Sequence, residues 1–268
     1  MDRASKPAAQ PNGIHHLAIG EIVVSALNDG VHQVSFDDLV ADDHPACVEA
    51  HLGEHRAAPP WLTINCFLLR CGGKLALIDA GFGPKTPFVG GLLRNLSATG
   101  AITEDIDLIL MTHMHPDHES GLLDPDGKAI FPNAELVLHE KELAYWRDEA
   151  AMASASEEAK GDFILARKAL SAYGDRLRTA REDEVLPGVR AMPTPGHTPG
   201  HTAWLIESAG DALLVWGDII HFPGIQFAFP GSSVAFDIDR AAAVAARNKV
   251  LQFAAQERIR VGGIHLDF

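Results

Sequence analysis

The sequence lacks any long uninterrupted apolar run and has a shortage of basic residues. No stretch of 18 apolar residues occurs, and the best candidate, residues 61–82, is broken by Asn65, Arg70, Lys74 and Asp79. A membrane-spanning helix is therefore not expected. The 22 Lys and Arg residues against 36 Asp and Glu residues give a net charge of −14. Because such a surface repels phosphate groups and anionic lipid, we expect neither a nucleic-acid nor a membrane partner.

Cysteine is also scarce, and three cysteines cannot make a full set of disulfides. Cys47, Cys66 and Cys71 are the three cysteines, and none of them belongs to a CxxC pair. We expect reduced thiols in a cytoplasmic protein, since the N-terminus also has no apolar segment typical of a signal peptide. Residues 1–13 are rich in Pro and Ala and are predicted to be a disordered tail, which leaves residues 14–268 as one domain.

The apolar patterns indicate strands first and interspersed helices later. Strands are predicted over residues 17–25, 31–36, 63–70, 74–79, 107–112, 135–139, 189–192, 202–207, 212–216, 259–262 and 264–266. Helices are predicted over residues 86–97, 140–149, 157–173 and 240–256. Turns are expected at residues 28–30 and 72–73, and the polar segment 37–60 is expected to be a long loop. Without repeats or an inter-domain linker, this order predicts a single α/β domain with layered elements.

What the chain has in excess is histidine, with 14 residues, and four potential metal ligands cluster in one short motif. His113 and His115 follow a predicted apolar strand, and side chains two residues apart on an extended segment share a face. They are therefore expected to reach the same metal ion. Asp117 and His118 follow Pro116, where the backbone must turn, and are expected to point at a second ion.

Further candidate ligands lie near the ends of later predicted strands. Residues 194–202 read Thr-Pro-Gly-His-Thr-Pro-Gly-His-Thr, and the two Pro-Gly pairs hold this loop rigid while allowing close approach of the backbone. It contains His197 and His201, of which only one need be a ligand. Asp218 ends a Trp-Gly-Asp sequence, and His265 follows Gly-Gly-Ile near the last strand. The motif of residues 194–202 indicates a metal site more strongly than Asp218 or His265 does alone.

Taken together, HMHPDH, TPGHTPGH, WGD and GGIHL occur in an order and at separations that resemble the metallo-β-lactamase-fold hydrolases. The resemblance covers about residues 17–268. It is strongest to the methyl parathion hydrolase and N-acyl-homoserine lactonase group, because of the long segment before HMHPDH and the sequence at residues 225–230. It implies a single-domain α/β fold, a four-layer αββα sandwich, with a dinuclear metal site at one edge. Since such relatives are often dimers, it also implies a homodimer.

The resemblance assigns seven metal ligands: His113, His115 and His197 to the first ion, Asp117, His118 and His265 to the second, and Asp218 to both. Imidazole and carboxylate ligands without thiolate suit Zn, with Mn, Fe or Co as alternatives. Two divalent metal ions about 3.5–4 Å apart bind a hydroxide between them and lower its pKa toward neutrality. The expected reaction is attack of that hydroxide on an electrophilic carbon or phosphorus.

Asp117 and His221 are the candidate catalytic residues. His221 lies three residues after Asp218, where resembling lactonases often place a Tyr that polarises the substrate carbonyl or protonates the leaving oxygen. A His there is also a suitable hydrogen-bond donor, although an ordinary loop histidine is the alternative interpretation. Asp79 matches the Asp-x-Gly turn of the family and is expected to orient a ligand imidazole or else to cap the turn. Thr112 is a weaker candidate for the same role.

Aromatic and apolar residues are candidates to line a pocket for an acyl chain or an aromatic ring, although core packing is the alternative for each of them. They are Trp61, Leu62, Phe82, Phe222, Phe227, Phe229 and Phe236. The remaining histidines are expected on the surface or in loops: His15, His16, His32, His44, His51, His55 and His139. Of these, His51 and His55 are further candidates to border the pocket.

The leading functional prediction is hydrolysis of a small-molecule lactone, specifically an N-acyl-homoserine lactone, as in quorum quenching. Hydrolysis of an organophosphate triester, as by methyl parathion hydrolase, is the nearest alternative, and a glyoxalase II-like thioesterase is a weaker one. A nuclease of this fold would need a basic surface, which a net charge of −14 opposes. A non-catalytic metal protein would tend to close its coordination shell, whereas seven ligands for two ions leave room for solvent.

Overall fold

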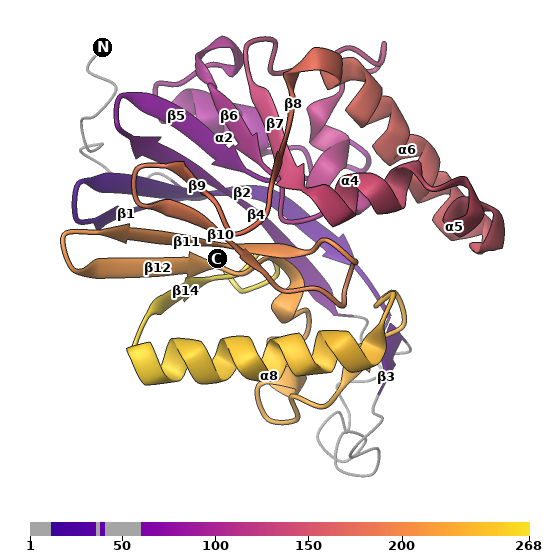
Figure 1. The fold of residues 1–268 in the computed structure, drawn as a ribbon. Coiled ribbons are helices and arrows are strands. Elements are labelled where there is room, and N and C mark those ends of the chain that lie inside the picture. Colours follow the sequence, from indigo (N-terminus) through magenta and orange to yellow (C-terminus); the bar gives the residue numbers. More distant parts are fainter. Residues whose placement is uncertain (1–11, 36–37, 41–59) are drawn as a thin grey trace.

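The computed structural model of the chain describes residues 12–35, 38–40 and 60–268 (Figure 1). Nearly all of the predicted N-terminal tail and most of the predicted 37–60 loop lie outside the described residues, as do His44, His51, His55 and Cys47. The described chain folds into two main sheets and seven α-helices.

The larger sheet has seven strands in the order β1-β2-β4-β5-β6-β7-β8. They are β1 (Ile14–Ile19), β2 (Ile22–Gln33), β4 (Trp61–Cys71), β5 (Lys74–Ile78), β6 (Leu108–Leu110), β7 (Glu135–His139) and β8 (Leu177–Ala180). Pairing is antiparallel from β1 to β5 and parallel from β5 to β8. The carboxyl ends of β5 and β6 therefore meet at the same edge of this sheet.

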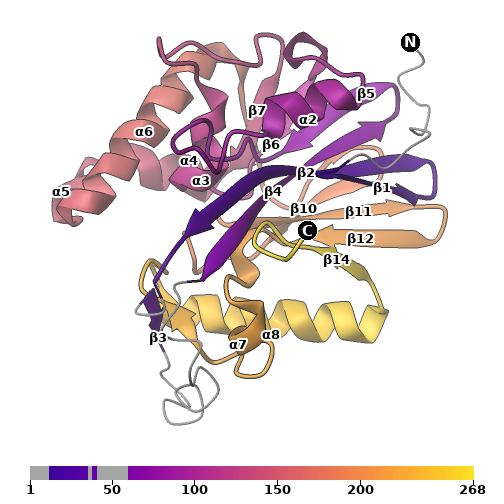
Figure 2. The same ribbon diagram turned by 180° about the vertical axis from the view of Figure 1, so that it is seen from behind.

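The smaller sheet has five strands in the order β14-β12-β11-β10-β9. They are β9 (Glu184–Leu186), β10 (Val189–Pro193), β11 (Thr202–Ser208), β12 (Asp211–Val215) and β14 (Arg260–Gly262). β14 is parallel to β12, whereas the other pairs are antiparallel. A separate pair joins β3 (Leu39–Val40) to β13 (Ser233–Val234), and β3 lies beyond the end of β2 (Figure 2).

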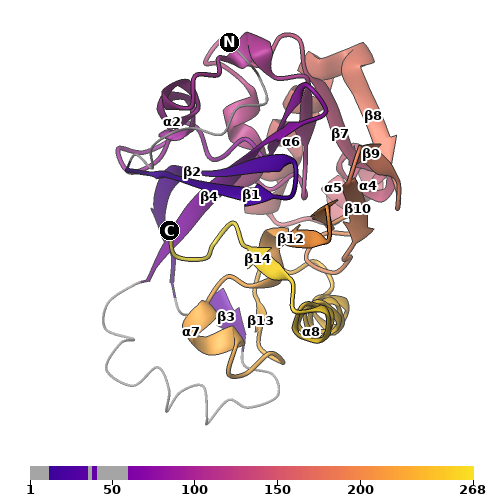
Figure 3. The same ribbon diagram turned by 90° about the vertical axis from the view of Figure 1, so that its left-hand side faces the viewer.

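Helices cover the outer faces of both sheets, so the layers run helix, sheet, sheet, helix (Figure 3). The helices are α2 (Leu92–Ala98), α3 (Pro116–Glu119), α4 (Glu140–Arg147), α5 (Glu149–Ser154), α6 (Glu157–Tyr173), α7 (Pro223–Gln226) and α8 (Arg240–Glu257). The predicted four-layer αββα sandwich is confirmed. In the part of the chain that the structure describes, no helix combines the length and apolar character needed to cross a bilayer.

β4 shows why the amino-acid sequences of the central strands are continuous apolar runs. Successive side chains point to opposite faces of a strand. Cys66 and Leu68 pack into the core between the large sheet and its helices, while Phe67 and Leu69 pack into the core between the two sheets. Because both faces of β4 are buried, both sets of side chains have to be apolar.

One local prediction failed because tertiary contacts use its residues differently. The turn predicted at residues 28–30 is wrong: β2 continues through it with a bulge, and β1 turns into β2 at residues 20–21. Asp29 instead accepts hydrogen bonds from the backbone N–H groups of Phe82 and Leu92. The hairpin turn at residues 72–73 is confirmed.

Several predicted elements are shorter than expected or are split. The predicted 86–97 helix begins only at Leu92, after a Gly-Gly pair. The predicted 140–149 helix ends at Arg147, because the carboxylate of Asp148 accepts the N–H groups of Ala150 and Ala151 and so starts α5. No strand forms over residues 264–266. The later helices agree closely, and the side chain of Asp239 caps α8 by accepting the N–H of Ala242.

Candidate metal centre

The candidate ligands gather where strands of both sheets end. The 113–118 motif follows β6 and begins α3, and the 194–201 loop connects β10 to β11. Asp218 follows β12, and His265 follows β14. Since β5 and β6 are parallel, as are β12 and β14, the segments after them converge at one edge of the sandwich. The fold thus brings together residues separated by up to 152 positions in the chain.

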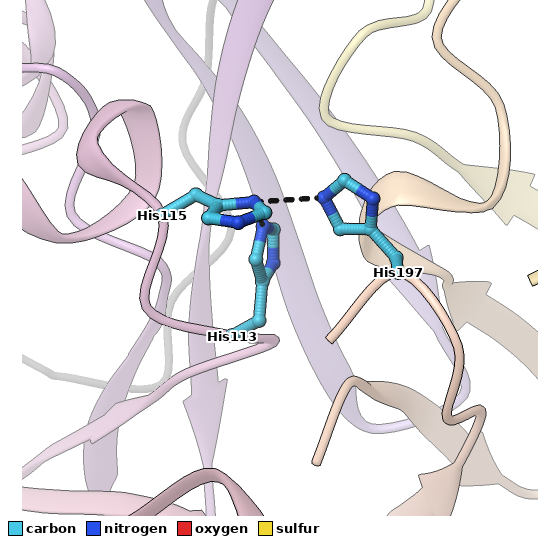
Figure 4. A group of neighbouring side chains, drawn as sticks. All are labelled: His113, His115 and His197. Atoms are coloured by element: carbon cyan, nitrogen blue, oxygen red, sulfur yellow. Dashed lines mark hydrogen bonds between the residues drawn. The ribbon is translucent and has the colours of Figure 1, made fainter. Parts of the chain in front are cut away.

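His113, His115 and His197 form the first group, and their rings point at one another (Figure 4). Nδ1 of His115 lies 3.0 Å from Nε2 of His113 and 2.9 Å from Nε2 of His197. Burial and neighbouring imidazoles hold the pKa of His113 and His115 well below the usual range, which favours the neutral form. One imidazole nitrogen facing two others cannot satisfy both by hydrogen bonding, whereas a cation would accept all three lone pairs.

Asp117, His118 and His265 form the second group. Oδ2 of Asp117 lies 3.6 Å from Nε2 of His118 and 3.4 Å from Nε2 of His265. Nε2 of His118 is buried and has no hydrogen-bond partner among the described residues. A buried polar atom without a partner is costly, so this nitrogen also fits a metal ligand.

Asp218 contacts both groups. Its Oδ2 atom lies 3.3 Å from Nε2 of His197 and 3.3 Å from Nε2 of His265, and its Oδ1 atom lies 3.2 Å from Nε2 of His118. Burial would raise the pKa of Asp218, but the surrounding imidazoles, with His118 foremost, hold it well below the usual range. The carboxylate is therefore charged and faces both clusters of nitrogen atoms.

His201 belongs to neither group, although it shares the loop of His197. Its Nε2 atom accepts a hydrogen bond from the backbone N–H of Asp218 at 2.9 Å, and its Nδ1 atom lies 2.7 Å from Oγ1 of Thr194. Burial lowers the pKa of His201 to about 3. Gly217 has φ +60°, and a Cβ there would lie 2.5 Å from Nε2 of His201. His201 therefore holds the backbone of Asp218, and His197 is the histidine of this loop that lies in the candidate ligand groups.

Asp79 lies where its predicted orienting role requires. Its Oδ2 atom is 2.8 Å from Nδ1 of His118, and it also accepts the hydroxyl of Thr112 at 2.7 Å. Its Oδ1 atom accepts the backbone N–H of Thr112. Asp79 has φ +56°, an unfavourable backbone conformation for a residue with a Cβ, which these three contacts stabilise. A carboxylate that is hydrogen-bonded to Nδ1 of an imidazole sets the tautomer and orientation of that ring, so that Nε2 is left for a metal ion.

Sequence reasoning missed a second such carboxylate, Asp237. Its Oδ1 atom lies 2.8 Å from Nδ1 of His197, and its Oδ2 atom accepts the backbone N–H of Val234. Asp237 follows β13 in an irregular segment 40 residues after its partner, and no motif in the sequence marks it. His265 is oriented differently: its Nδ1 atom lies 2.9 Å from the carbonyl oxygen of Thr63.

His221 lies beside the cluster and is 1% exposed. Its Nε2 atom is 3.0 Å from Oδ2 of Asp218, and its ring stacks on that of His265. Burial lowers the pKa of His221 to about 4. The side chain of Gln226 accepts the backbone N–H of His221 at 2.7 Å and so fixes the position of the residue. His221 could also serve as a ligand together with His197 and Asp218.

A cavity of about 280 Å³ opens onto this cluster. Its lining includes His115, Asp117, Asp218, His221 and His265 together with His32, Val34, Asp38, Leu62, Ile64, Phe82, Pro116, Asp162 and Phe236. The lining thus combines apolar side chains with polar side chains, among them those of the cluster. A larger cavity of about 440 Å³, which β1, β2 and the segment around β14 help to line, contains none of the clustered ligands.

Three of the seven predicted pocket residues line the cavity: Leu62, Phe82 and Phe236. Phe222 and Phe229 pack instead into a small apolar cluster under α7. Trp61 and Phe227 are about half exposed. Among the other histidines, the surface prediction was wrong for His16 and His139, which are buried, whereas His32 is partly exposed and lines the cavity.

Comparison with known proteins agrees with this geometry. Residues 59–257 match the metallo-beta-lactamase superfamily. The solved structure of hydrolase AbOPH, in the beta lactamase superfamily, is 31% identical, with a TM-score of 0.87 over 97% of this chain and 92% of that one. AidC, a dizinc quorum-quenching lactonase in complex with a product acyl-homoserine, is 27% identical, also with a TM-score of 0.87, over 96% of this chain and 91% of that one.

An N-acyl homoserine lactonase of Bacillus sp is 32% identical over 134 residues, which is 49% of this chain and 46% of that protein. The match thus spans less than half the length of that relative. The superfamily match, in contrast, covers most of the chain and includes six of the seven predicted ligands. The chain belongs to the metallo-beta-lactamase superfamily and is a metal-dependent hydrolase related to the N-acyl homoserine lactonases.

Proposed function

We propose that the protein opens the ring of an N-acyl-homoserine lactone and that it uses two divalent metal ions to do so. The observation that carries the proposal is the contact of Asp218 with both ligand groups, next to a cavity that apolar side chains help to line. In this proposal the seven side chains divide as follows: His113, His115 and His197 for one ion, Asp117, His118 and His265 for the other, and Asp218 for both.

The ligand set favours Zn, with Mn, Fe or Co as alternatives, because it combines imidazole and carboxylate without thiolate. The likeness to a dizinc lactonase, AidC, supports both the metal and the count of two. When bound, such ions supply Lewis acidity and an activated water for attack on the lactone carbonyl. The carboxylates of Asp79 and Asp237 keep His118 and His197 in the tautomer that presents Nε2 to the ion.

The reaction adds water across the ester bond of the ring, so that the ring C–O bond breaks and leaves a carboxylate and a hydroxyl. The leaving oxygen needs a proton. Asp117 is suited to deliver it, since its side chain is 26% exposed and lines the cavity. His221 lines the same cavity and is suited to donate a hydrogen bond to a substrate oxygen. The apolar side chains of Leu62, Phe82 and Phe236 are suited to hold the acyl chain.

The side chains that line the cavity offer no cationic partner to an anionic substrate. Asp38, Asp117 and Asp162 are among its lining residues, and no Lys or Arg occurs among the described residues that line it. The carboxylates of a thioester of the glyoxalase II type would therefore find no Lys or Arg partner among these side chains. A neutral lactone and a neutral phosphotriester would both be accepted on this ground, so the choice between them rests on His221.

The test compares two substrates on one preparation of zinc-loaded protein. We expect kcat/KM for a long-chain N-acyl-homoserine lactone to exceed that for methyl parathion in the same buffer. We expect His221→Ala to reduce lactone turnover, whereas His16→Ala, which removes a buried histidine of β1, leaves it unchanged. A ratio well below one would replace the lactonase proposal with phosphotriester hydrolysis. Equal turnover by the His221→Ala variant and the unmodified protein would remove His221 from the mechanism.

A further inference from the structure

Glu142 lies outside the candidate ligand set, yet it connects both loops of the first histidine group. It sits in the first turn of α4, directly after β7, and its side chain is completely buried. Its Oε1 atom accepts the backbone N–H of Met114, which lies between His113 and His115, at 3.0 Å. Its Oε2 atom accepts the hydroxyl of Thr198 at 2.6 Å. One carboxylate therefore bridges the 113–118 motif and the 194–201 loop.

Two further donors complete the environment of this carboxylate. Oε2 of Glu142 also accepts the backbone N–H of Gly200 at 3.0 Å, and Oε1 accepts the indole N–H of Trp146 at 2.6 Å. The Trp146 ring in turn packs edge-on against His115, with ring centroids 5.8 Å apart. Each of the two oxygen atoms must therefore accept two hydrogen bonds. An ionised carboxylate can do so, whereas a side-chain amide has only one oxygen acceptor.

The 194–201 loop also approaches the backbone of α4 closely at Glu142. A Cβ at Gly200 would lie 2.2 Å from the backbone nitrogen of Glu142 and 2.5 Å from its Cβ. The second Pro-Gly pair of the TPGHTPGH motif thus lets the loop reach α4. The distance between the loop and the helix is set by direct contact, and the hydrogen bonds of Glu142 hold it there.

We propose that Glu142 is the positioning residue that joins the two histidine loops into one metal site, an inference that rests on the metal centre proposed above. Burial of a carboxylate is unfavourable unless its oxygen atoms are hydrogen-bonded, and all four bonds here go to the two loops or to the indole that packs on His115. Glu142 acts through the backbone N–H groups of Met114 and Gly200, the Thr198 hydroxyl and the Trp146 indole, and does not touch an ion or substrate. It sets the distance between the His113–His115 pair and His197.

The test measures cobalt binding, which reports the site without relying on turnover. Glu142→Gln keeps the shape of the side chain but turns one acceptor into a donor, so one loop loses its link. We expect Co²⁺ affinity, measured by competition with a chelator, to fall by about 10- to 100-fold, the usual range for loss of a residue that supports metal ligands. We also expect the visible absorption spectrum of bound Co²⁺ to change. Asp107→Asn is the matched control, because Asp107 accepts a backbone N–H at the opposite end of β6.

A second pair of variants tests the same link from the other loop. Thr198→Val removes the hydroxyl that donates to Glu142, whereas Thr198→Ser keeps it. We expect weaker Co²⁺ binding and an altered spectrum for the Val variant, and near-normal values for the Ser variant. Unchanged Co²⁺ affinity and spectrum in both Glu142→Gln and Thr198→Val would overturn the inference, and if Glu142→Gln fails to fold, the Thr198 pair decides. Failure of the unmodified protein to bind Co²⁺ would contradict the metal centre itself.

Discussion

A single added methyl group at Gly200 should disturb the metal centre from outside it. In Gly200→Ala, the new Cβ would lie 2.2 Å from the backbone nitrogen of Glu142, and an ordinary contact begins at 3.4 Å. The 194–201 loop and α4 must therefore separate by more than an ångström. Such overpacking costs about 1–3 kcal/mol. For a domain of this size, that corresponds to a fall in Tm of roughly 2–12 °C.

The same displacement should reduce activity by more than the loss of stability explains, because His197 moves with the loop. A shift of about 1 Å in a positioned group costs roughly 100-fold in rate. The assay measures kcat/KM for a lactone, with Tm by calorimetry, on metal-loaded protein at a temperature where the variant is folded. Gly161→Ala is the control, since nothing lies within 4 Å of a Cβ there and α6 should gain about 0.5–1 kcal/mol. Normal activity and Tm in Gly200→Ala would refute the steric argument.

Three other predictions concern the surroundings of the cluster. Asp237→Asn should weaken metal binding by about 10- to 100-fold, measured by chelator competition, because it removes the carboxylate that orients His197; unchanged affinity would contradict this role. Arg247→Met should lower the free energy of unfolding by about 3 kcal/mol in urea titration, because the buried guanidinium donates to the carbonyl oxygens of Ile219 and Ser232; a loss below about 0.5 kcal/mol would be inconsistent with those bonds. Removing metal with a chelator should lower Tm, since an ion at 1,000 times its Kd stabilises the folded state by about 4 kcal/mol, and calorimetry that shows no shift would argue against a tightly held ion.

The sequence predicted most of the features that depend on residues close to one another along the chain. Apolar runs such as residues 136–138 of β7 predicted buried strands, because a strand covered on both faces needs apolar side chains. The spacing in the 113–118 motif predicted which imidazoles share a direction, and the structure brings His113 and His115 together with His197. The αββα sandwich followed from the resemblance that these motifs carry, and the structure confirms it.

Predictions failed where a residue has a distant partner. Residues 28–30 have the composition of a turn, but Asp29 accepts N–H groups more than 50 positions away, and β2 continues through as a bulge. Four of the predicted pocket residues lie outside the cavity, because an apolar side chain looks the same in sequence whether it lines a cavity or packs in a core. His32 shows the converse, since nothing near it in sequence indicates that it faces the cavity.

The sequence by itself determined the type of chemistry, because ligand residue types and their short-range spacing are local properties. Only the tertiary structure decided which histidine of the 194–201 loop joins the cluster and which holds Asp218. It also decided that Asp237 and Glu142 support the cluster. These assignments depend on hydrogen bonds between residues 17 to 58 positions apart, and such contacts exist only once the sheets and helices have packed.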